Sequence, residues 1–406
     1  MTPMNTSALH DAPTGDQPSA RGLAFARHLV GLNTVSRNSN LELIDVVRDE
    51  LKRLGVASRL TWNEDRTKAN LFATLGEGKP AGVILSGHTD TVPWDGQAWT
   101  VDPLGATVRD GRLYGRGSAD MKGFIGCCVA LADRILQADL PHAVHLALSY
   151  DEEVGGFGVR HLVADLREAG LQPTLCLVGE PTDMVPALSH KGVYRMRCCV
   201  KGKPAHSSLT PQAVNAVEAA ARIISRIADM GDRWRAEGPF VEGFDVPWTT
   251  AAVCRVDGGI ADNVVPEDCR FHYEFRNLPG TEAEDFQRDL EQWTERLLPA
   301  MHAVDATTGI RFEKFAEMPA FLAQPDEPAA RLAAVLAGTQ VTTRVAFGTE
   351  AGLFQRAGMS TVICGPGSIG QAHQPDEFVS LAQLAQCEAF VGRLAAGAAV
   401  GLVGAR

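Results

Sequence analysis

The segment AGVILSGHTD, residues 81–90, decides the fold class, because a short continuous apolar run ends in polar residues. Runs of the same kind recur at VHLALSYDEE (144–153) and TLCLVGEPT (174–182). Helical stretches lie between them, among them GFIGCCVALADRILQ (123–137) and GVRHLVADLREAG (158–170). This alternation predicts an α/β domain whose sheet is covered by helices on both faces. Ligands bind beyond the strand ends of such sheets, where HTD, DEE and GEPT fall.

The order of the expected strands and helices changes between Lys191 and Phe321. Its expected order is strand, helix, strand, strand, helix, strand, which is the signature of a ferredoxin-like α+β unit. The expected strands are 193–202, 249–259, 269–278 and 309–316, and the expected helices are 213–230 and 282–298. We therefore expect residues 191–321 to be a second domain inserted between two parts of the α/β domain, 21–190 and 322–406.

Length and composition agree with two domains and exclude some classes of protein. A chain of 406 residues exceeds the size at which one hydrophobic core usually stops growing. The net charge is −11 without a basic cluster, which argues against nucleic acid as a partner. No apolar stretch is long enough to span a bilayer, so we expect no membrane insertion. Residues 1–20 lack the basic start and apolar core of a signal peptide and are expected to be a disordered tail.

The cysteines bear on the cellular compartment. Nine are scattered along the chain without a CxxC pair, which favours a reducing, cytoplasmic location. The adjacent pairs at 127–128 and 198–199 are either redox-active or metal-binding, or simply small buried hydrophobic residues. We adopt the last interpretation and assign them no function.

Candidate metal ligands begin with the HTD and SADMK segments. His88 and Asp90 lie two apart on an extended segment and so point the same way, which lets one bind a metal while the other braces it. An ordinary hydrogen-bonded pair is the alternative. Asp120 directly precedes an apolar helix, where a carboxylate either binds a metal or caps the helix.

Further acidic and histidine residues follow other apolar runs. The three consecutive acids at 151–153 repel one another without structural benefit unless a cation compensates them, although a solvated turn is an alternative. Glu180 ends TLCLVGEPT, and His373 lies in the loop GSIGQAHQPDE after TVICG. Two histidines and three carboxylates suit Zn(II), with Co(II) or Mn(II) as substitutes. Two such ions would polarise a carbonyl and lower the pKa of a shared water.

These motifs resemble those of a known family. The chain resembles the co-catalytic zinc amidohydrolases, which include acetylornithine deacetylase, succinyl-diaminopimelate desuccinylase, aminoacylases and carboxypeptidases. The resemblance covers nearly all of the chain after residue 20 and preserves the order of the motifs. The motifs are SGHTDTVP (86–93), GRGSADMKGF (115–124), SYDEEVGG (149–156), GEPT (179–182) and AHQPDEF (372–378).

The resemblance implies a zinc-peptidase-like catalytic domain that binds two Zn(II) ions per subunit. By it, His88, Asp120 and Glu180 would bind one ion. Asp120, Glu153 and His373 would bind the other, which makes Asp120 the bridge.

The resemblance also implies catalytic roles and an assembly. Asp90 would orient His88, and Glu152 would take a proton from the bridging water and pass it to the leaving amine. His206, in GKPAHSS, is similar to a histidine that stabilises the tetrahedral oxyanion, supplied in dimeric relatives by the partner subunit. The resemblance thus implies that 191–321 is a lid and dimerisation domain and that the protein is a homodimer.

Four further residues are candidates for contact with substrate. Asn263 and Arg276 resemble residues that hold the substrate carboxylate, although Asn263 also suits a turn and Arg276 a surface salt bridge. Glu350 is a candidate partner for a cationic substrate side chain, with a structural carboxylate as the alternative. Gly367 lies in a loop that could offer backbone groups to substrate or be a plain turn.

The resemblance also ranks substrates. FGTEAGLF (347–354) and the lid phrase GKPAHSSLTPQAVNAVE (202–218) are more similar to acetylornithine deacetylases than to the desuccinylases, which carry Ser-Asp-Gly where this chain has Glu-Ala-Gly at 350–352. This implies hydrolysis of N2-acetyl-L-ornithine to L-ornithine and acetate, a step of arginine biosynthesis. The alternatives are succinyl-diaminopimelate desuccinylase or a broader N-acyl-amino-acid hydrolase or dipeptidase. A non-catalytic binding protein on the same scaffold is a third hypothesis, which the retained base and ligand set disfavour.

Overall fold

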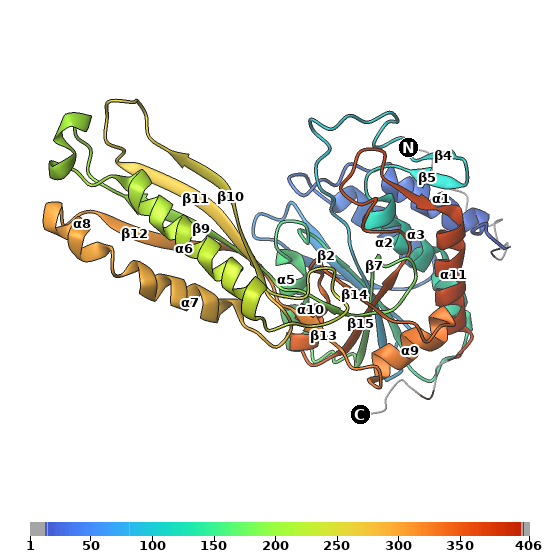
Figure 1. The fold of residues 1–406 in the computed structure, drawn as a ribbon. Helices are drawn as coiled ribbons and strands as arrows, with labels where there is room; N and C mark the ends of the chain where they lie inside the picture. Colours follow the sequence, from blue (N-terminus) through green and yellow to red (C-terminus); the bar gives the residue numbers. More distant parts are fainter. Residues whose placement is uncertain (1–12, 14, 81, 399–400, 402–406) are drawn as a thin grey trace. The chain divides into compact units, whose positions relative to one another are not determined.

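The structure is a computed structural model that describes residues 13, 15–80, 82–398 and 401 (Figure 1). The chain forms two compact units. Unit 1 contains the described residues up to Leu188 together with 322–344 and those from Thr349 onward, and unit 2 contains 189–321 and 345–348. The expected disordered tail lies mostly outside the described residues. Ser19, within that range, is buried and accepts a hydrogen bond from the Gly22 N–H, so it caps the first helix of unit 1.

Unit 1 is built on a nine-stranded sheet in the order β1-β2-β6-β3-β7-β15-β8-β13, with β14 paired to β8. The central strands β6, β3, β7 and β15 run parallel. Every residue of β3 and β6 is buried, as their unbroken apolar sequences require in a sheet covered on both faces. The strands are β1 Ser58–Trp62, β2 Ala69–Leu75, β3 Val83–His88, β6 Val144–Ser149, β7 Leu175–Pro181, β8 Ala187–His190, β13 Phe321–Leu322, β14 Thr343–Val345 and β15 Ser360–Gly365.

Helices cover both faces of this sheet. Figure 1 shows α1, α3 and α11 on one side and α5 and α10 on the other. The stretch 123–137, expected as one helix, divides at Leu131, whose φ of −100° and ψ of 4° leave helical geometry. The helices are α1 Ala20–Val30, α2 Leu41–Arg53, α3 Gly123–Ala130, α4 Ala132–Gln137, α5 Phe157–Glu168, α9 Pro328–Ala337, α10 Ala351–Arg356 and α11 Leu381–Ala395.

A small second sheet in unit 1 joins distant parts of the chain. It has the order β16-β5-β4, from β16 Phe378–Ser380, β5 Arg112–Tyr114 and β4 Thr107–Arg109. Phe378 pairs with Tyr114, so the segment after the His373 loop lies beside the segment that leads to Asp120. The apolar pattern of the sequence did not predict this sheet.

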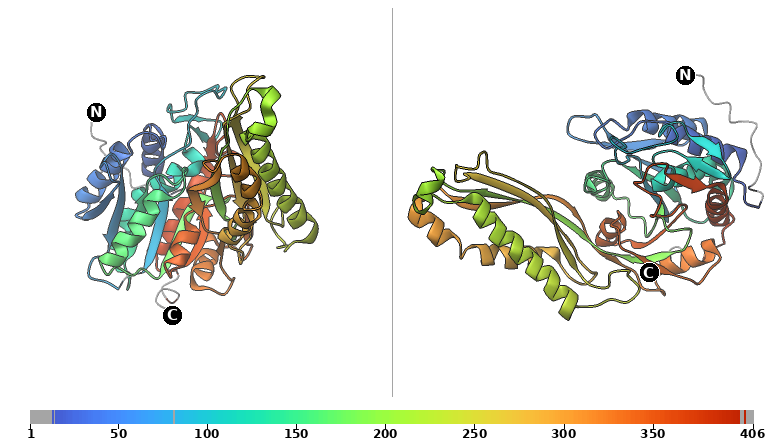
Figure 2. Two further views of the ribbon diagram at one scale, coloured as in Figure 1. Left: turned by 90° about the vertical axis from the view of Figure 1, so that its left-hand side faces the viewer. Right: turned by 45° about the horizontal axis from the view of Figure 1, so that its top comes forward.

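Unit 2 has the order β9-α6-β10-β11-α7-α8-β12. Its antiparallel sheet has the strand order β10-β11-β9-β12, and α6 and α7 pack on one face (Figure 2). Burial alternates along β9 and β11, as expected for strands with one covered face. The elements are β9 Val193–Lys201, α6 Ala216–Glu237, β10 Thr250–Gly258, β11 Asp268–Arg276, α7 Ala283–Thr294, α8 Leu298–Val304 and β12 Gly309–Met318.

The expected fold class is confirmed, since unit 1 is the α/β sheet with helices and unit 2 has the βαββαβ order of a ferredoxin-like domain. The helix expected over 282–298 ends at Thr294 in the structure, and a further helix that was not expected, α8, follows over Leu298–Val304. Among the described residues, none of the helices combines the length and the apolar character needed to cross a membrane. Seven of the nine cysteines are buried, and all nine are free thiols.

Candidate active site

His88 lies at the carboxyl end of β3 and is 1% exposed. Its ring Nε2 is 2.8 Å from Asp120 Oδ1 and 3.6 Å from Glu180 Oε1. Glu180 belongs to β7, which is the parallel neighbour of β3, so the two side chains meet because both strands end at the same edge of the sheet.

Asp120 lies in a kinked turn over Ser118–Lys122, with φ of −124° and ψ of 90°, before α3. While Oδ1 faces His88, Oδ2 is 3.1 Å from His373 Nε2. The same nitrogen of His373 is 3.1 Å from Glu153 Oε1. Asp120 thus lies between two groups, one with His88 and Glu180 and one with Glu153 and His373. No side-chain bond caps α3, so the alternative of Asp120 as a helix cap receives no support.

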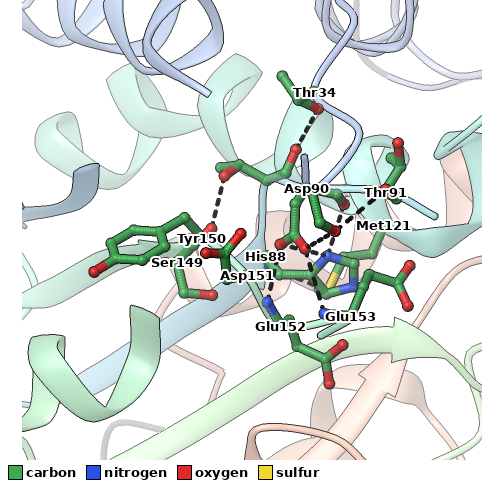
Figure 3. Close-up of polar contacts among 12 residues, drawn as sticks. Thr34, His88, Asp90, Thr91, Met121, Ser149, Tyr150, Asp151, Glu152 and Glu153 are labelled. Atoms are coloured by element: carbon green, nitrogen blue, oxygen red, sulfur yellow. Dashed lines mark hydrogen bonds and ion pairs between the residues drawn. The ribbon is translucent and has the colours of Figure 1, made fainter. Parts of the chain in front are cut away.

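Glu152 is 9% exposed and lies beside the first group. Single ligand atoms of His88, Glu152 and Glu180 lie within 4.8 Å of one another. The carboxylate of Asp90 fixes the turn that carries Glu152, because Oδ1 accepts from the Glu152 N–H at 3.1 Å and Oδ2 from the Glu153 N–H at 3.3 Å (Figure 3).

Asp90 also contacts His88, but the nearer acceptor is its main chain. His88 Nδ1 is 3.0 Å from the Asp90 carbonyl oxygen and 3.7 Å from the carboxylate Oδ1. The hydroxyl of Ser36 donates to Asp90 Oδ2 at 2.7 Å. Asp90 therefore orients His88 through its carbonyl oxygen and holds the 152–153 turn through its carboxylate.

The electrostatics of the site fit a pair of cations. Burial, together with neighbouring carboxylates, raises the pKa of Glu152 and of Glu180 well above its usual range. Burial alone would lower the pKa of His373, but Asp120 and Glu153 outweigh it and raise that pKa to about 11. Four carboxylates gathered around two imidazoles repel one another unless positive charge compensates them. Imidazole and carboxylate donors are the ligands that Zn(II) and related divalent ions prefer.

Two candidates in unit 2, His206 and Asn263, lie together. His206 forms a bridge with Val264, and the Ser207 N–H donates to the Asn263 carbonyl at 2.9 Å. His206 is exposed, and its Nδ1 lies 2.8 Å from the Ser208 hydroxyl.

Arg276 lies at the opposite end of unit 2, as the last residue of β11. Its Nε donates to Glu274 Oε1 at 2.8 Å and its Nη2 to Oε2 at 3.3 Å. The Glu274 carboxylate therefore fixes the orientation of the guanidinium group. The salt-bridge alternative for Arg276 is thus present in the structure, with an acceptor on its own strand.

Glu350 and Gly367, proposed to contact substrate, have their polar groups engaged within unit 1. Glu350 is 1% exposed and accepts hydrogen bonds from the hydroxyls of Ser86 and Ser149. The Gly367 N–H donates to Gln383 Oε1 at 2.5 Å. Gly367 has a φ of +96°, and a Cβ there would come within 2.8 Å of the Ala119 Cβ. These contacts favour the structural alternatives for both residues.

Three residues that hydrogen-bond within or to the segments carrying Asp120 and His373 were not predicted from the sequence, namely Gln97, Arg116 and Glu377. Arg116 and Glu377 are each 1% exposed and form an ion pair with an Nη1–Oε2 distance of 2.8 Å. Both lie within the motifs that carry Asp120 and His373. A charged residue within a predicted ligand motif was a signal available from the sequence for these two residues, whereas Gln97 gave none.

Comparison with known proteins agrees with this architecture. An acetylornithine deacetylase of Myxococcus xanthus is 36% identical over 387 residues, which cover 92% of this chain and 96% of that protein. The crystal structure of aminopeptidase PepT from Bacillus cereus matches with a TM-score of 0.71 at 18% identity, covering 96% of this chain and all of that one. The Bacillus subtilis YXEP protein, a dinuclear metal-binding peptidase of the M20 family, matches with a TM-score of 0.62 at 17% identity, covering 93% and 97%. Residues 84–397 match the family described as peptidase family M20/M25/M40, and the chain belongs to that family.

Proposed function

We propose that this protein is a metal-dependent amidohydrolase that cleaves N2-acetyl-L-ornithine to L-ornithine and acetate. The reaction class rests on one observation. Asp120 lies between two groups of histidine and carboxylate side chains, and Glu152 lies beside them. The substrate follows from similarity to the Myxococcus xanthus acetylornithine deacetylase over nearly the whole chain. Such a reaction belongs to arginine biosynthesis, and the scattered free thiols support a cytoplasmic location.

Two divalent ions complete the proposed site, with Zn(II) as the ion and Co(II) or Mn(II) as substitutes. His88, Asp120 and Glu180 would hold one, and Asp120, Glu153 and His373 the other. When bound, the ions would polarise the scissile carbonyl and lower the pKa of a water molecule between them.

Glu152 supplies the proton transfer in this proposal. Its carboxylate takes a proton from the attacking water as the new C–O bond forms, and gives it to the amine nitrogen as the C–N bond breaks. Burial favours this role, because it raises the pKa of Glu152 toward the pH at which the residue must both accept and release a proton.

The geometry of unit 2 supports a homodimer. The two ends of β11, Asp268 and Arg276, are about 27 Å apart at the usual rise of an antiparallel strand. Asn263 and His206 lie beyond the Asp268 end, since the chain still pairs there through the Gly202 N–H to the Glu267 carbonyl at 2.6 Å. A small amino-acid derivative cannot touch both ends of one unit 2.

We therefore assign the two ends to different subunits at each active site. Arg276 of one subunit would hold the substrate carboxylate. The partner subunit would supply Asn263 and His206, and His206 would donate a hydrogen bond to the oxyanion. The edge strand β10 favours an interface, because Val256 is 53% exposed and Ile260, just beyond the strand, is 88% exposed. In this assembly unit 2 acts as the lid and dimerisation domain.

The proposal is tested by acetate release from N2-acetyl-L-ornithine. The purified protein is treated with a chelator, assayed, and assayed again after Zn(II) or Co(II) is restored. We expect activity to disappear with the metal and to return with it. Metal-independent cleavage would contradict the two-metal site.

A substrate panel separates the alternatives, because only pocket residues select the acyl group. N-succinyl-diaminopimelate, other N-acetyl amino acids and dipeptides are compared by kcat/KM. A tenfold or greater preference for any of them over N2-acetyl-L-ornithine would overturn the proposed substrate and keep the reaction class. If the protein binds two metal ions but turns over none of these substrates, the result would favour a binding protein on this scaffold.

A further inference from the structure

The loop that carries His373 is held by a separate segment of unit 1, residues 97–101. Gln97 Nε2 donates to the His373 carbonyl oxygen at 2.8 Å. The N–H of Thr100 donates to Asp376 Oδ1 at 2.8 Å, and its hydroxyl to Oδ2 at 2.7 Å. This support matters because His373 has a φ of +62°, a left-handed conformation that costs about 1–2 kcal/mol for a residue with a Cβ.

The turn that carries Asp120 is held from the same side by Glu377. Oε1 of Glu377 accepts from the Ala119 N–H at 3.0 Å and from the Asp120 N–H at 3.2 Å. Glu377 is placed there by the small sheet, because it directly precedes β16 and its carbonyl accepts from the Gly115 N–H at 2.9 Å.

Arg116 joins these two supports. Its Nη1 donates to Glu377 Oε2 at 2.8 Å, and its Nη2 donates to Gln97 Oε1 at 2.5 Å. The guanidinium carbon lies 5.0 Å from the centre of the Trp99 ring, whose Nε1 donates to the same Gln97 oxygen at 3.0 Å. One buried, planar cation thus fixes a chain of hydrogen bonds from the His373 carbonyl to the Asp120 N–H, and a lysine would lack the rigid fork that directs two N–H groups at the two acceptors.

We propose that Gln97, Arg116 and Glu377 are positioning residues that set the distance between Asp120 and His373, and so build one of the two metal sites. The inference rests on the proposed two-metal function. The hydrogen bonds of this network reach the Asp120 N–H and the His373 carbonyl, and among the described residues none of them reaches the main chain of His88 or Glu180. The site formed by Asp120, Glu153 and His373 therefore depends on it more than the site formed by His88, Asp120 and Glu180.

The variant Gln97→Ala tests this inference, because Gln97 is only partly buried and its removal spares the core. The chelated full-length protein is titrated with Co(II), and the two dissociation constants are measured by competition with a chromophoric chelator. We expect one constant to rise about 10- to 100-fold and the other to stay within about threefold. The kcat measured at low Co(II) should fall and should return as Co(II) is raised, because the weakened site is then filled.

Gln355→Ala is the matched control. Gln355 also donates a side-chain N–H to a backbone carbonyl within unit 1, that of Leu322 at 2.5 Å, but it serves no ligand loop. Both Co(II) constants and the kcat of this variant should equal those of the wild type. If they fold, Arg116→Lys and Glu377→Gln should show the same loss of Co(II) affinity at one of the two sites. If they do not fold, Gln97→Ala alone tests the inference.

A second titration identifies the affected site. In a His373→Ala background, Gln97→Ala should leave the remaining Co(II) constant unchanged, because the site it supports is already lost. Unchanged constants in Gln97→Ala, or an equal rise in both, would overturn the inference alone. A wild-type protein that binds fewer than two Co(II) ions would overturn the proposed function together with it.

Discussion

At the scale of single residues, Asp120 links the two halves of the proposed metal centre. Its two oxygens face different histidines, His88 at 2.8 Å and His373 at 3.1 Å. A capping carboxylate would instead direct an oxygen to backbone N–H groups of the following helix. The sequence left both alternatives open at this position, and the direction of the side chain in the structure favours the ligand.

Glu152 is the residue on which the proposed chemistry depends most directly. We expect Glu152→Gln to lower kcat about 10²- to 10⁴-fold, because glutamine has the same shape but cannot carry the proton. Metal content, measured by elemental analysis, should stay at two ions per subunit, since Glu152 is not among the proposed ligands. A variant that keeps its activity within tenfold would remove Glu152 from its role.

Gly367 gives a prediction about packing beside Asp120. We expect Gly367→Ala to lower the free energy of unfolding by about 1–3 kcal/mol beyond the backbone cost, because the new Cβ would meet the Cβ of Ala119 at 2.8 Å. The kcat/KM should also fall, since Ala119 adjoins Asp120. Urea unfolding and steady-state assays measure the two effects.

Gly358→Ala is the control for that substitution. Gly358 has a similar φ, +91° against +96°, but a Cβ there would meet nothing within 4 Å. It should show only the backbone cost of about 1 kcal/mol and full activity. Equal losses in the two variants would mean that the contact with Ala119 has no effect.

At the scale of secondary structure, β11 of unit 2 carries a charge pair with a testable pH dependence. Burial opposes ionisation of Glu274, but Arg276 and Arg195 outweigh it and lower its pKa below the usual value. An acid with a lowered pKa stabilises the fold above its unfolded pKa, and this contribution is lost as the pH falls through the folded pKa. The pair therefore contributes at neutral pH and less below about pH 4.5.

We expect Glu274→Gln to reduce the free energy of unfolding by about 1–2 kcal/mol at pH 7, as for the loss of a charged hydrogen bond. The difference from wild type should shrink as the pH falls below about 4.5, because a protonated glutamate resembles glutamine. Urea titrations of both proteins from pH 7 down through the folded pKa of Glu274, which lies below 4.5, measure it. A difference independent of pH would show that the charge of Glu274 contributes nothing.

The elements that the sequence predicted best are those whose apolar pattern is continuous or strictly periodic. The central strands β3, β6 and β7 lie within the predicted apolar runs, because burial on both faces demands an unbroken apolar sequence. The three-residue strands β4, β5 and β16 were missed, since so short a segment shows no period. Their pairing depends on chain segments far apart in the sequence.

The residues of the candidate site also differ in how far the sequence predicted them. Residues such as His88 and Glu180 were predictable, because each ends a strand of one parallel sheet and the ends of parallel strands meet. Gln97 was not predictable, because its contact with His373 joins residues 276 positions apart without a local pattern. The sequence therefore does not predict contacts between loops that lie far apart along the chain.

At the scale of the whole molecule, the proposed active site needs residues from both ends of unit 2. Within one subunit, His206 lies beyond one end of β11 and Arg276 at the other, about 27 Å away or more at the usual strand rise. Two groups fixed in one compact unit cannot close on the same small substrate. The proposed answer is a dimer in which each active site combines residues of two chains.

Mixed dimers of two inactive variants test this assembly. His206→Ala should lower kcat about 10²- to 10³-fold through loss of an oxyanion donor, and Glu152→Gln should be nearly inactive. If His206 acts on the partner's site, a mixed dimer holds one intact site, because the His206→Ala chain keeps its Glu152 and receives His206 from its partner. A 1:1 mixture that exchanges subunits freely should then recover about a quarter of the wild-type activity, since about half of the dimers are mixed and each has one of two sites intact. If His206 acts within its own chain, every site in the mixture lacks one of the two groups, and mixing should recover nothing.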